Sequence, residues 1–179
     1  MIEVYFVAVI ILLLFAAFGL FACNNETEVE LNNTPIDLAA VEKAVDAAAD
    51  AYLEASKNLN TDYIDSVYHE NGIFIGTDPE EYWSKDTIMS LYKKLLEDTS
   101  INFDITIHKR VINVDHDGKS ALVTEQSFHD HISKDVYVRT ITRYINIDDT
   151  WKIDYINWSL APTNDQLRFI WKAFKEKEE

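Results

Sequence analysis

The chain has 179 residues, and its 31 acidic and 16 basic side chains give a formal net charge of −15 at pH 7. This acidity excludes a nucleic-acid-binding protein and a polybasic membrane patch, because both depend on clustered Lys and Arg. Hydrophobic residues at 47% exclude intrinsic disorder for the bulk of the chain, and a single cysteine excludes an internal disulfide and a thiolate metal cluster.

The N-terminal segment is apolar and ends at the cysteine. Residues 4–22 contain no charged side chain and could span much of a bilayer as a helix. The run ends in Leu20-Phe21-Ala22-Cys23, with an aliphatic residue three positions before the cysteine and a small residue directly before it. These residues resemble the lipobox of bacterial lipoprotein signal peptides. The resemblance implies cleavage after Ala22 and diacylglycerol and palmitate on Cys23, which together would anchor the chain in the membrane.

An uncleaved transmembrane anchor is the alternative, because no Lys or Arg precedes the apolar run. Residues 24–34 are polar and acidic, and as a tether they reach about 36–40 Å when extended. We therefore expect a signal peptide (1–22), a lipidated cysteine and tether (23–34), and one domain (35–179). Asn24 is not the Asp that retains such proteins at an inner membrane, so a bacterial cell envelope with two membranes would carry the protein in the outer one.

The remaining elements follow from hydrophobic periodicity. Thr34-Pro35-Ile36-Asp37 is typical of a helix start, and a helical apolar stripe follows it through Leu53. From Phe103 onward the period changes to two, which indicates strands. In chain order we expect helices from residue 34, over 61–69 and from Ser84, a strand at 72–76, four strands near 103–115, 120–132, 135–147 and 151–160, and a last helix capped by Asn164. Helices followed by an antiparallel meander predict an α+β fold.

Two segments, Gly72 to Trp83 and Trp151 to Ser159, resemble the SnoaL-like branch of the nuclear transport factor 2-like superfamily. The order of the predicted elements agrees with that family over residues 36–162, although Asn157 stands where the family often has His. The resemblance implies a cone of curved antiparallel sheet packed on three helices, with a pocket inside and usually in a dimer. Members include isomerases, cyclases and dehydratases as well as pockets without a known reaction, so the fold leaves the function open.

The strand register predicts which side chains line the pocket. A two-residue turn at Asp117-Gly118 pairs Arg110 with Glu125 and His108 with Ser127, and paired residues share a face. Turns at Ser133-Lys134 and Asp148-Asp149 extend this face across the sheet. One end of it is apolar (Ile112, Val114, Val123, Tyr144, Trp151 and Ile153), and the other is polar (His108, Arg110, Glu125, Ser127, His129, Thr140, Thr142 and Asn157).

The opposite face is expected to carry ten apolar residues (Phe103, Ile105, Ile107, Val111, Leu122, Phe128, Ile141, Ile145, Ile156 and Trp158). A surface this apolar predicts a homodimer interface, or a surface covered by the last helix. The two faces could also be exchanged, because a slip of one residue at a turn inverts them.

The candidate ligand-binding residues are Trp83, His108, Arg110, Glu125, Thr140, Tyr155 and Asn157. Arg110 opposite Glu125 is either a ligand clamp or an ordinary cross-strand ion pair. Trp83 is either a stacking wall or a packing residue before the helix at Ser84. The candidates for general acid or base are Glu125 and His129. We expect Arg110 to lower the pKa of Glu125 and to keep it from acting as a base.

His129 and His131 point the same way on a strand, as metal ligands do, but the spacing supplies no third ligand. We therefore expect no metal and no cofactor. The sequence favours an envelope lipoprotein that binds a small, partly apolar molecule, or that mediates an interaction without catalysis. An isomerase, cyclase or dehydratase is the alternative.

Overall fold

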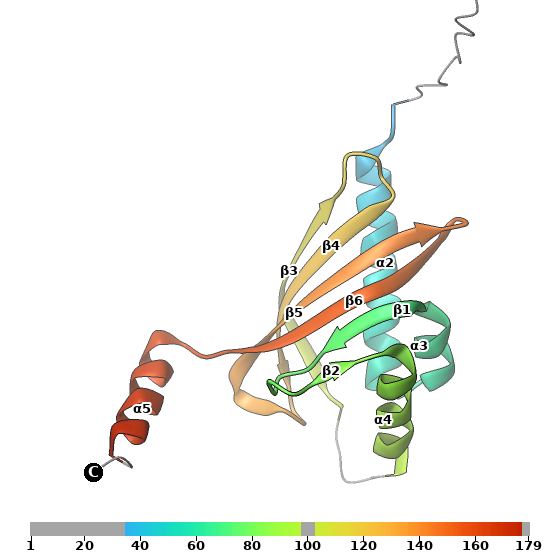
Figure 1. Cartoon of the computed structure of the whole chain (residues 1–179). Coiled ribbons are helices and arrows are strands. Elements are labelled where there is room, and N and C mark those ends of the chain that lie inside the picture. The colour runs from blue at the N-terminus through green and yellow to red at the C-terminus, as the bar shows by residue number, and fades with distance from the viewer. Residues whose placement is uncertain (1–34, 98–102, 177–179) are drawn as a thin grey trace, which may run out of the picture. The chain divides into compact units, whose positions relative to one another are not determined.

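The computed structural model describes residues 35–97 and 103–176 (Figure 1). The predicted signal peptide, Cys23, the tether and Thr34 lie outside these residues. The described elements are α2 (Leu38–Lys57), α3 (Thr61–Val67), β1 (Tyr68–Ile75), β2 (Tyr82–Trp83), α4 (Lys85–Glu97), β3 (Ile105–Val114), β4 (Ser120–His129), β5 (Ser133–Ile147), β6 (Thr150–Ala161) and α5 (Asn164–Lys175). Residues 36–179 form a unit with its own hydrophobic core.

The strands form one curved sheet in the order β2-β1-β6-β5-β4-β3 (Figure 1). Strands β3 to β6 are the predicted antiparallel meander. β1 lies parallel to β6, so the sheet is mixed rather than wholly antiparallel. Parallel pairing needs a long connection, and α4 with β3 to β5 separates β1 from β6 along the chain. The predicted α+β fold with a sheet on helices and a C-terminal helix is confirmed.

Two helix starts differ from the sequence prediction by one or more residues. The N-cap of α2 is Asp37, whose Oδ1 accepts from the backbone N–H groups of Ala39 and Ala40, both at 3.1 Å. The N-cap of α5 is Thr163 rather than Asn164, and Thr163 forms a reciprocal capping box with Gln166. Both caps satisfy first-turn N–H groups that have no intrahelical partner. None of the residues of α5 is buried, and Gln166 Nε2 donates to the Asp135 carbonyl at 2.9 Å.

The β3–β4 register is confirmed next to the turn and changes further along. Arg110 pairs with Glu125 as predicted, and Gly118 adopts a φ of +65° in the turn. His108 is then an extra residue on β3, so Ile107, not His108, pairs with Ser127. This β-bulge moves the β3 side chains that precede His108 in the chain to the face opposite the predicted one.

A second irregularity occurs on β6. Tyr144 pairs with Ile153, but Arg143 pairs with Tyr155, so Asp154 is an extra residue. Beyond it, Ile156 pairs with Thr142 and Trp158 pairs with Thr140. Ile156 and Trp158 therefore join the concave face, which packs against the helices, and Tyr155 and Asn157 join the convex face.

The predicted turn at Ser133-Lys134 is also wrong, because β5 already begins at Ser133 and its pairing with β4 is shifted. Glu125 pairs with Thr140, where the predicted turn would pair it with Thr142. A shift of two residues preserves the alternation of side chains. Thr140 and Thr142 therefore still lie on the predicted face, and both are buried.

The bulges also correct the predicted dimer surface. Ile105, Ile107, Ile156 and Trp158 were expected on the outer face, but they belong to the concave side. Val111 and Leu122 lie on the convex face as predicted and are 41% and 44% exposed. The apolar convex surface is thus smaller than the sequence pattern indicated.

Candidate functional site: a pocket on the concave face

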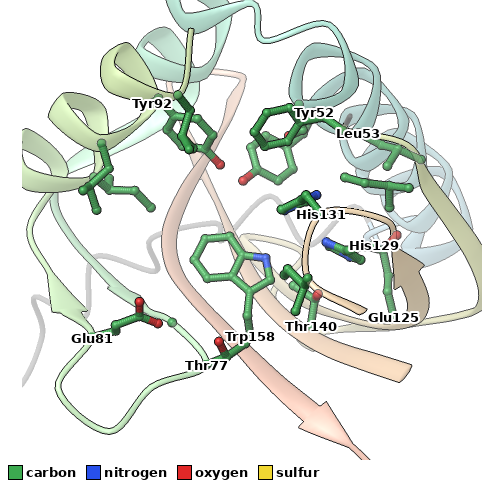
Figure 2. A pocket seen from close by; sticks show the side chains of 18 of the residues that line it. Tyr52, Leu53, Thr77, Glu81, Tyr92, Glu125, His129, His131, Thr140 and Trp158 are labelled. Carbon is green, nitrogen blue, oxygen red and sulfur yellow. The ribbon is translucent and has the colours of Figure 1, made fainter. Parts of the chain in front are cut away.

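A cavity of about 320 Å³ lies between the concave face of the sheet and helices α2 and α4 (Figure 2). Its walls come from the described helices and strands other than α3, β1 and α5, and from the loops between them. The described lining residues are Tyr52, Leu53, Ser56, Gly76, Thr77, Glu81, Trp83, Ile88, Leu91, Tyr92, Leu95, Phe103, Ile105, Ile107, Glu125, His129, His131, Ile132, Thr140 and Trp158. Most of the lining is apolar, with a small number of polar groups, as in typical ligand sites.

The sheet contributes one continuous row of side chains to this cavity. Glu125 on β4 pairs with Thr140 on β5, which pairs with Trp158 on β6. Directly paired residues on one face have neighbouring side chains. The indole of Trp158 extends into the middle of the pocket (Figure 2). The row thus presents a carboxylate, a hydroxyl and an aromatic ring side by side.

The helical side of the pocket carries tyrosines joined by their hydroxyl groups. The hydroxyls of Tyr52 on α2 and Tyr68 lie 2.6 Å apart, and those of Tyr68 and Tyr92 on α4 lie 3.5 Å apart. Burial raises the pKa of Tyr52 and of Tyr68 well above 10. Their phenols therefore stay protonated at neutral pH and can donate hydrogen bonds.

Glu125 is a partly buried lining residue that shares a cation with two other carboxylates. Arg110 Nε donates to Glu125 Oε1 at 2.7 Å, and Arg110 Nη1 lies 2.6 Å from Oδ1 of both Asp46 and Asp50 on α2. Burial lowers the pKa of Arg110, but these three hydrogen bonds outweigh it and raise that pKa. Arg110 is therefore always charged, and its charge is divided among three acids.

The expected effect of Arg110 on Glu125 is wrong in its net direction. Arg110 does lower the pKa of Glu125, but burial raises it by more, and Asp50 and Asp46 add to the increase. The net pKa of Glu125 lies above the ordinary value of 4.5. A carboxyl group with a raised pKa holds its proton more readily and, once ionised, is a stronger base.

His129 lies deeper in the pocket wall, next to Ser127. The Ser127 hydroxyl and His129 Nε2 are 2.9 Å apart, and both residues are buried. Burial and the neighbouring His131 lower the pKa of His129 to about 4, so its ring is neutral at pH 7. The His131 ring contacts Phe103, with ring centroids 4.5 Å apart, and burial lowers the pKa of His131 too.

The rings of His129 and His131 have centroids 5.6 Å apart. In the described part of the chain, no three His, Cys, Asp or Glu residues are grouped as a metal would require. Zinc sites use three or four protein ligands. Both rings line the pocket, and burial disfavours their positively charged forms.

Trp83, Glu125, Thr140 and His129, all selected from the sequence, line the cavity. Arg110 is not part of the lining and reaches the site through its ion pair with Glu125.

The predicted pocket placement of His108, Tyr155 and Asn157 is wrong. The bulges at His108 and Asp154 exclude all three from the concave face. The His108 ring packs edge-on against Phe128 and Tyr137, with centroids 5.0 and 5.3 Å away. Asn157 Oδ1 accepts from the Ser159 hydroxyl at 2.6 Å.

Sequence reasoning missed the pocket roles of Phe103, Ile105, Ile107 and Trp158. The alternation of the strands assigned them to the outer face, and no residue type marks either bulge. Tyr52 and Tyr92 also line the cavity, and their helical spacing indicates an inward-facing position without showing that a pocket lies there. Their exposure to the cavity depends on how far the sheet curves away from α2 and α4.

Residues 45–163 match the sequence profile of the SnoaL-like domain family. The chain belongs to this family. A comparison with curated protein sequences found no significant match. Among residues 35–97 and 103–176, no helix of the SnoaL-like chain is long and apolar enough to cross a bilayer.

Solved structures share the fold at low sequence identity. A cystatin-like fold protein from Burkholderia xenovorans has 16% identity and a TM-score of 0.59, over 73% of this chain and 96% of that one. A nuclear transport factor 2-like protein of unknown function from Pseudomonas putida has 12% identity and a TM-score of 0.59, over 72% and 92%. A candidate scytalone dehydratase from Novosphingobium aromaticivorans has 14% identity and a TM-score of 0.58, over 72% and 90%. These identities establish the fold alone.

Proposed function

We propose that this SnoaL-like domain binds a small, partly apolar molecule in the concave pocket without converting it. The observation that carries the proposal is the lining, in which aromatic and aliphatic walls surround a few polar groups at fixed positions. A volume of about 320 Å³ is at the lower end of the range for small-molecule sites. The walls would supply the affinity, and Glu125, Thr140 and the tyrosine hydroxyls would orient the molecule.

The hydrogen bonds of the pocket support binding over chemistry. Glu125 Oε1 is held by Arg110, and His129 Nε2 is held by Ser127. A base that acts on a substrate must be within reach of the proton that it removes. Among the described residues, no hydrogen bond joins Glu125 to His129, so the two do not form a proton relay.

The test is to purify residues 35–179 from the native host and to release any bound molecule by denaturation for mass spectrometry. Thr140→Phe should fill the cavity and abolish binding. Ile141→Phe is the matched control, because Ile141 is the next residue of β5 and faces the convex side. Both variants are first compared in thermal unfolding. A molecule that stays bound to a folded Thr140→Phe protein would show that it does not occupy the pocket.

One observation favours an enzyme as the second candidate, namely the raised pKa of Glu125 in the cavity. In that case Glu125 would take a proton from a substrate, as general bases in dry sites do. The released molecule would then change in mass or in structure when it is incubated with wild-type protein. Glu125→Gln should abolish that change even when the molecule is supplied at a concentration that saturates the variant. If the molecule is unchanged by the wild type, the binding function stands.

We also propose that the domain is anchored in a bacterial envelope by lipid on Cys23. The support is the sequence Leu20-Phe21-Ala22-Cys23 at the end of the apolar run. Fatty-acid labelling of the wild type and of Cys23→Ser should give label in the wild type alone. Equal label in both would contradict lipidation at Cys23. A mature mass that retains residues 1–22 would favour the transmembrane anchor.

The convex face supports the proposal of a homodimer. Val111 and Leu122 are exposed on it, and the rings of Phe128 and Tyr137 stack there with centroids 4.2 Å apart. Leu122→Lys should shift residues 35–179 towards monomer in sedimentation. Leu96→Lys, which changes an exposed leucine on α4, should leave the association unchanged. A wild-type monomer at tens of micromolar would refute the homodimer.

A further inference from the structure

The charges that line the pocket are all of one sign. Its described lining includes two carboxylates, Glu81 and Glu125, and none of its residues is Lys or Arg. Five aromatic side chains complete the walls: Tyr52, Trp83, Tyr92, Phe103 and Trp158. The face of an aromatic ring carries partial negative charge, so rings and carboxylates favour the same kind of ligand.

The cation that contacts Glu125 is already neutralised. Arg110 lies behind Glu125 and contacts Asp46 and Asp50 as well, all within 2.7 Å. One guanidinium against three carboxylates leaves this cluster with a formal charge of −2. Arg110 therefore does not offer a free positive charge to an anionic ligand.

Glu81 is held at the other side of the pocket by the hairpin between β1 and β2. Its Oε2 accepts from the backbone N–H of Asp78 at 2.9 Å. A Cβ at position 76 would collide with this carboxylate and with the Trp83 ring, and Gly76 has none. Figure 2 shows Glu81 on one side of the Trp158 indole and Glu125 on the other.

We propose that the ligand of this pocket is a small organic cation, with an ammonium group attached to an apolar or aromatic body. The proposal rests on the proposed binding function and names the class of molecule. Aromatic faces and carboxylates attract an ammonium group together, as in known sites for quaternary ammonium ligands. An anion of the same shape would meet two carboxylates and no cation, which selects against it.

Two further features agree with this selectivity. His129 and His131 also line the pocket, and burial disfavours their positively charged forms. They therefore do not offset the carboxylates at neutral pH. Residues 35–179 carry 16 basic against 27 acidic side chains. A negative surface of this kind raises the local concentration of cations near the pocket.

The experiment compares three probes of nearly the same shape and different charge. Phenyltrimethylammonium is the cation, tert-butylbenzene is its uncharged isostere, and benzenesulfonate is the anion. Each is titrated into residues 35–179 at low salt, and binding is followed by the tryptophan fluorescence and by NMR. We expect the cation to bind about tenfold more tightly than the uncharged isostere, which is the effect of a cation over desolvated aromatic faces. The anion should bind most weakly.

Variants that each remove one carboxylate test whether the preference for the cation arises in the pocket. Glu125→Gln and Glu81→Gln should each lower the affinity for phenyltrimethylammonium about threefold or more and leave that for tert-butylbenzene unchanged. Glu80→Gln is the matched control, because it removes the same charge from an exposed position in the same hairpin. Glu81→Gln provides an independent test if Glu125→Gln fails to fold.

Each outcome is decisive. If tert-butylbenzene or benzenesulfonate binds as tightly as the cation, the cation proposal is wrong and the binding function stands. If none of the three probes binds, the cation proposal and the proposed binding function are both overturned. If Glu80→Gln weakens binding of the cation as much as the two pocket variants do, the preference for the cation comes from the general surface charge. In that case the proposed site is wrong.

Discussion

The two ends of the concave face differ although the same strands build both. At the closed end, Val114, Ala121, Tyr144, Ile153 and Tyr68 form a paired row across β3, β4, β5, β6 and β1. The row packs against Val45 and Ala49 of α2 and Ile64 of α3. At the open end, Glu125, Thr140 and Trp158 form a paired row across β4, β5 and β6 that lines a cavity. Both rows obey the same strand alternation, so the difference lies in whether helical side chains fill the space above them.

This comparison separates residues that stabilise the domain from residues available to a ligand. Most side chains at the closed end are buried, and their removal leaves an unfilled space. Side chains at the open end already face a cavity, so their removal enlarges an existing space. Polar groups are tolerated there because a ligand or water can satisfy them.

The largest expected effect comes from shortening an isoleucine to alanine at each end of the concave face. Ile153→Ala, at a residue with 0% exposure, should lower the free energy of unfolding by about 2–5 kcal/mol. Ile107→Ala removes the same atoms from a half-exposed lining residue and should cost about 1 kcal/mol, because less surface was removed from water. Urea unfolding of both variants measures the difference. Equal losses would show that the two ends are packed alike.

Acid should destabilise the domain through the open end. His129 has a pKa of about 4 in the folded chain and about 6.5 when unfolded, so only the unfolded state binds a proton in between. Above about pH 6.5 the neutral ring contributes about 3 kcal/mol to the free energy of unfolding, and this contribution is lost as the pH falls to about 4. His129→Gln should remove this part of the pH dependence of unfolding, and His116→Gln in the exposed turn should not. An unchanged slope in His129→Gln would contradict the burial of the neutral ring.

Removal of the shared cation should destabilise the open end to an intermediate degree. Arg110→Met loses charged hydrogen bonds to three carboxylates and should cost about 2 kcal/mol at neutral pH. Burial then raises the pKa of Glu125 without opposition, so the folded state keeps that proton to a higher pH. Stability falls as the pH rises through this pKa, and the loss should be larger at pH 8 than at pH 5. Arg139→Met, an exposed arginine on β5, is the control.

A loss that does not depend on pH would mean that Glu125 keeps its charge equally well without Arg110. In that case the carboxylate would be solvated from the cavity. The ion pair would then be an ordinary surface pair of small energetic value.

The smallest expected effect concerns the hydroxyl that faces the cavity. Thr140→Val exchanges this hydroxyl for a methyl group of similar size, and the described residues provide no protein hydrogen bond to it. Because no partner is left unsatisfied, the free energy of unfolding should change by less than about 1 kcal/mol. Thermal unfolding measures it. A loss of about 2 kcal/mol would place Thr140 in a buried hydrogen-bond network instead of at the pocket surface.

Several features of this comparison were predictable from local sequence. The turn at Asp117 and Gly118 sets the register next to it, so the pairing of Arg110 with Glu125 followed directly. The gradient from apolar to polar residues along the strands predicted a closed end and an open end. Helical spacing identified the inward faces of α2 and α4. Each of these depends on residues that are close together in the chain, where short-range geometry is decisive.

The tertiary structure alone decided the membership of the pocket and its electrostatics. One inserted residue at His108 brought Ile105 and Ile107 to the concave face. Another at Asp154 exchanged Tyr155 and Asn157 for Ile156 and Trp158, because strand alternation has a period of two. No residue type in the sequence marks these insertions. The net rise in the pKa of Glu125 depends on how deeply the helices bury it and on how Asp46 and Asp50 share Arg110. Burial is a property of distant elements packed together, and residue spacing along one strand does not contain it.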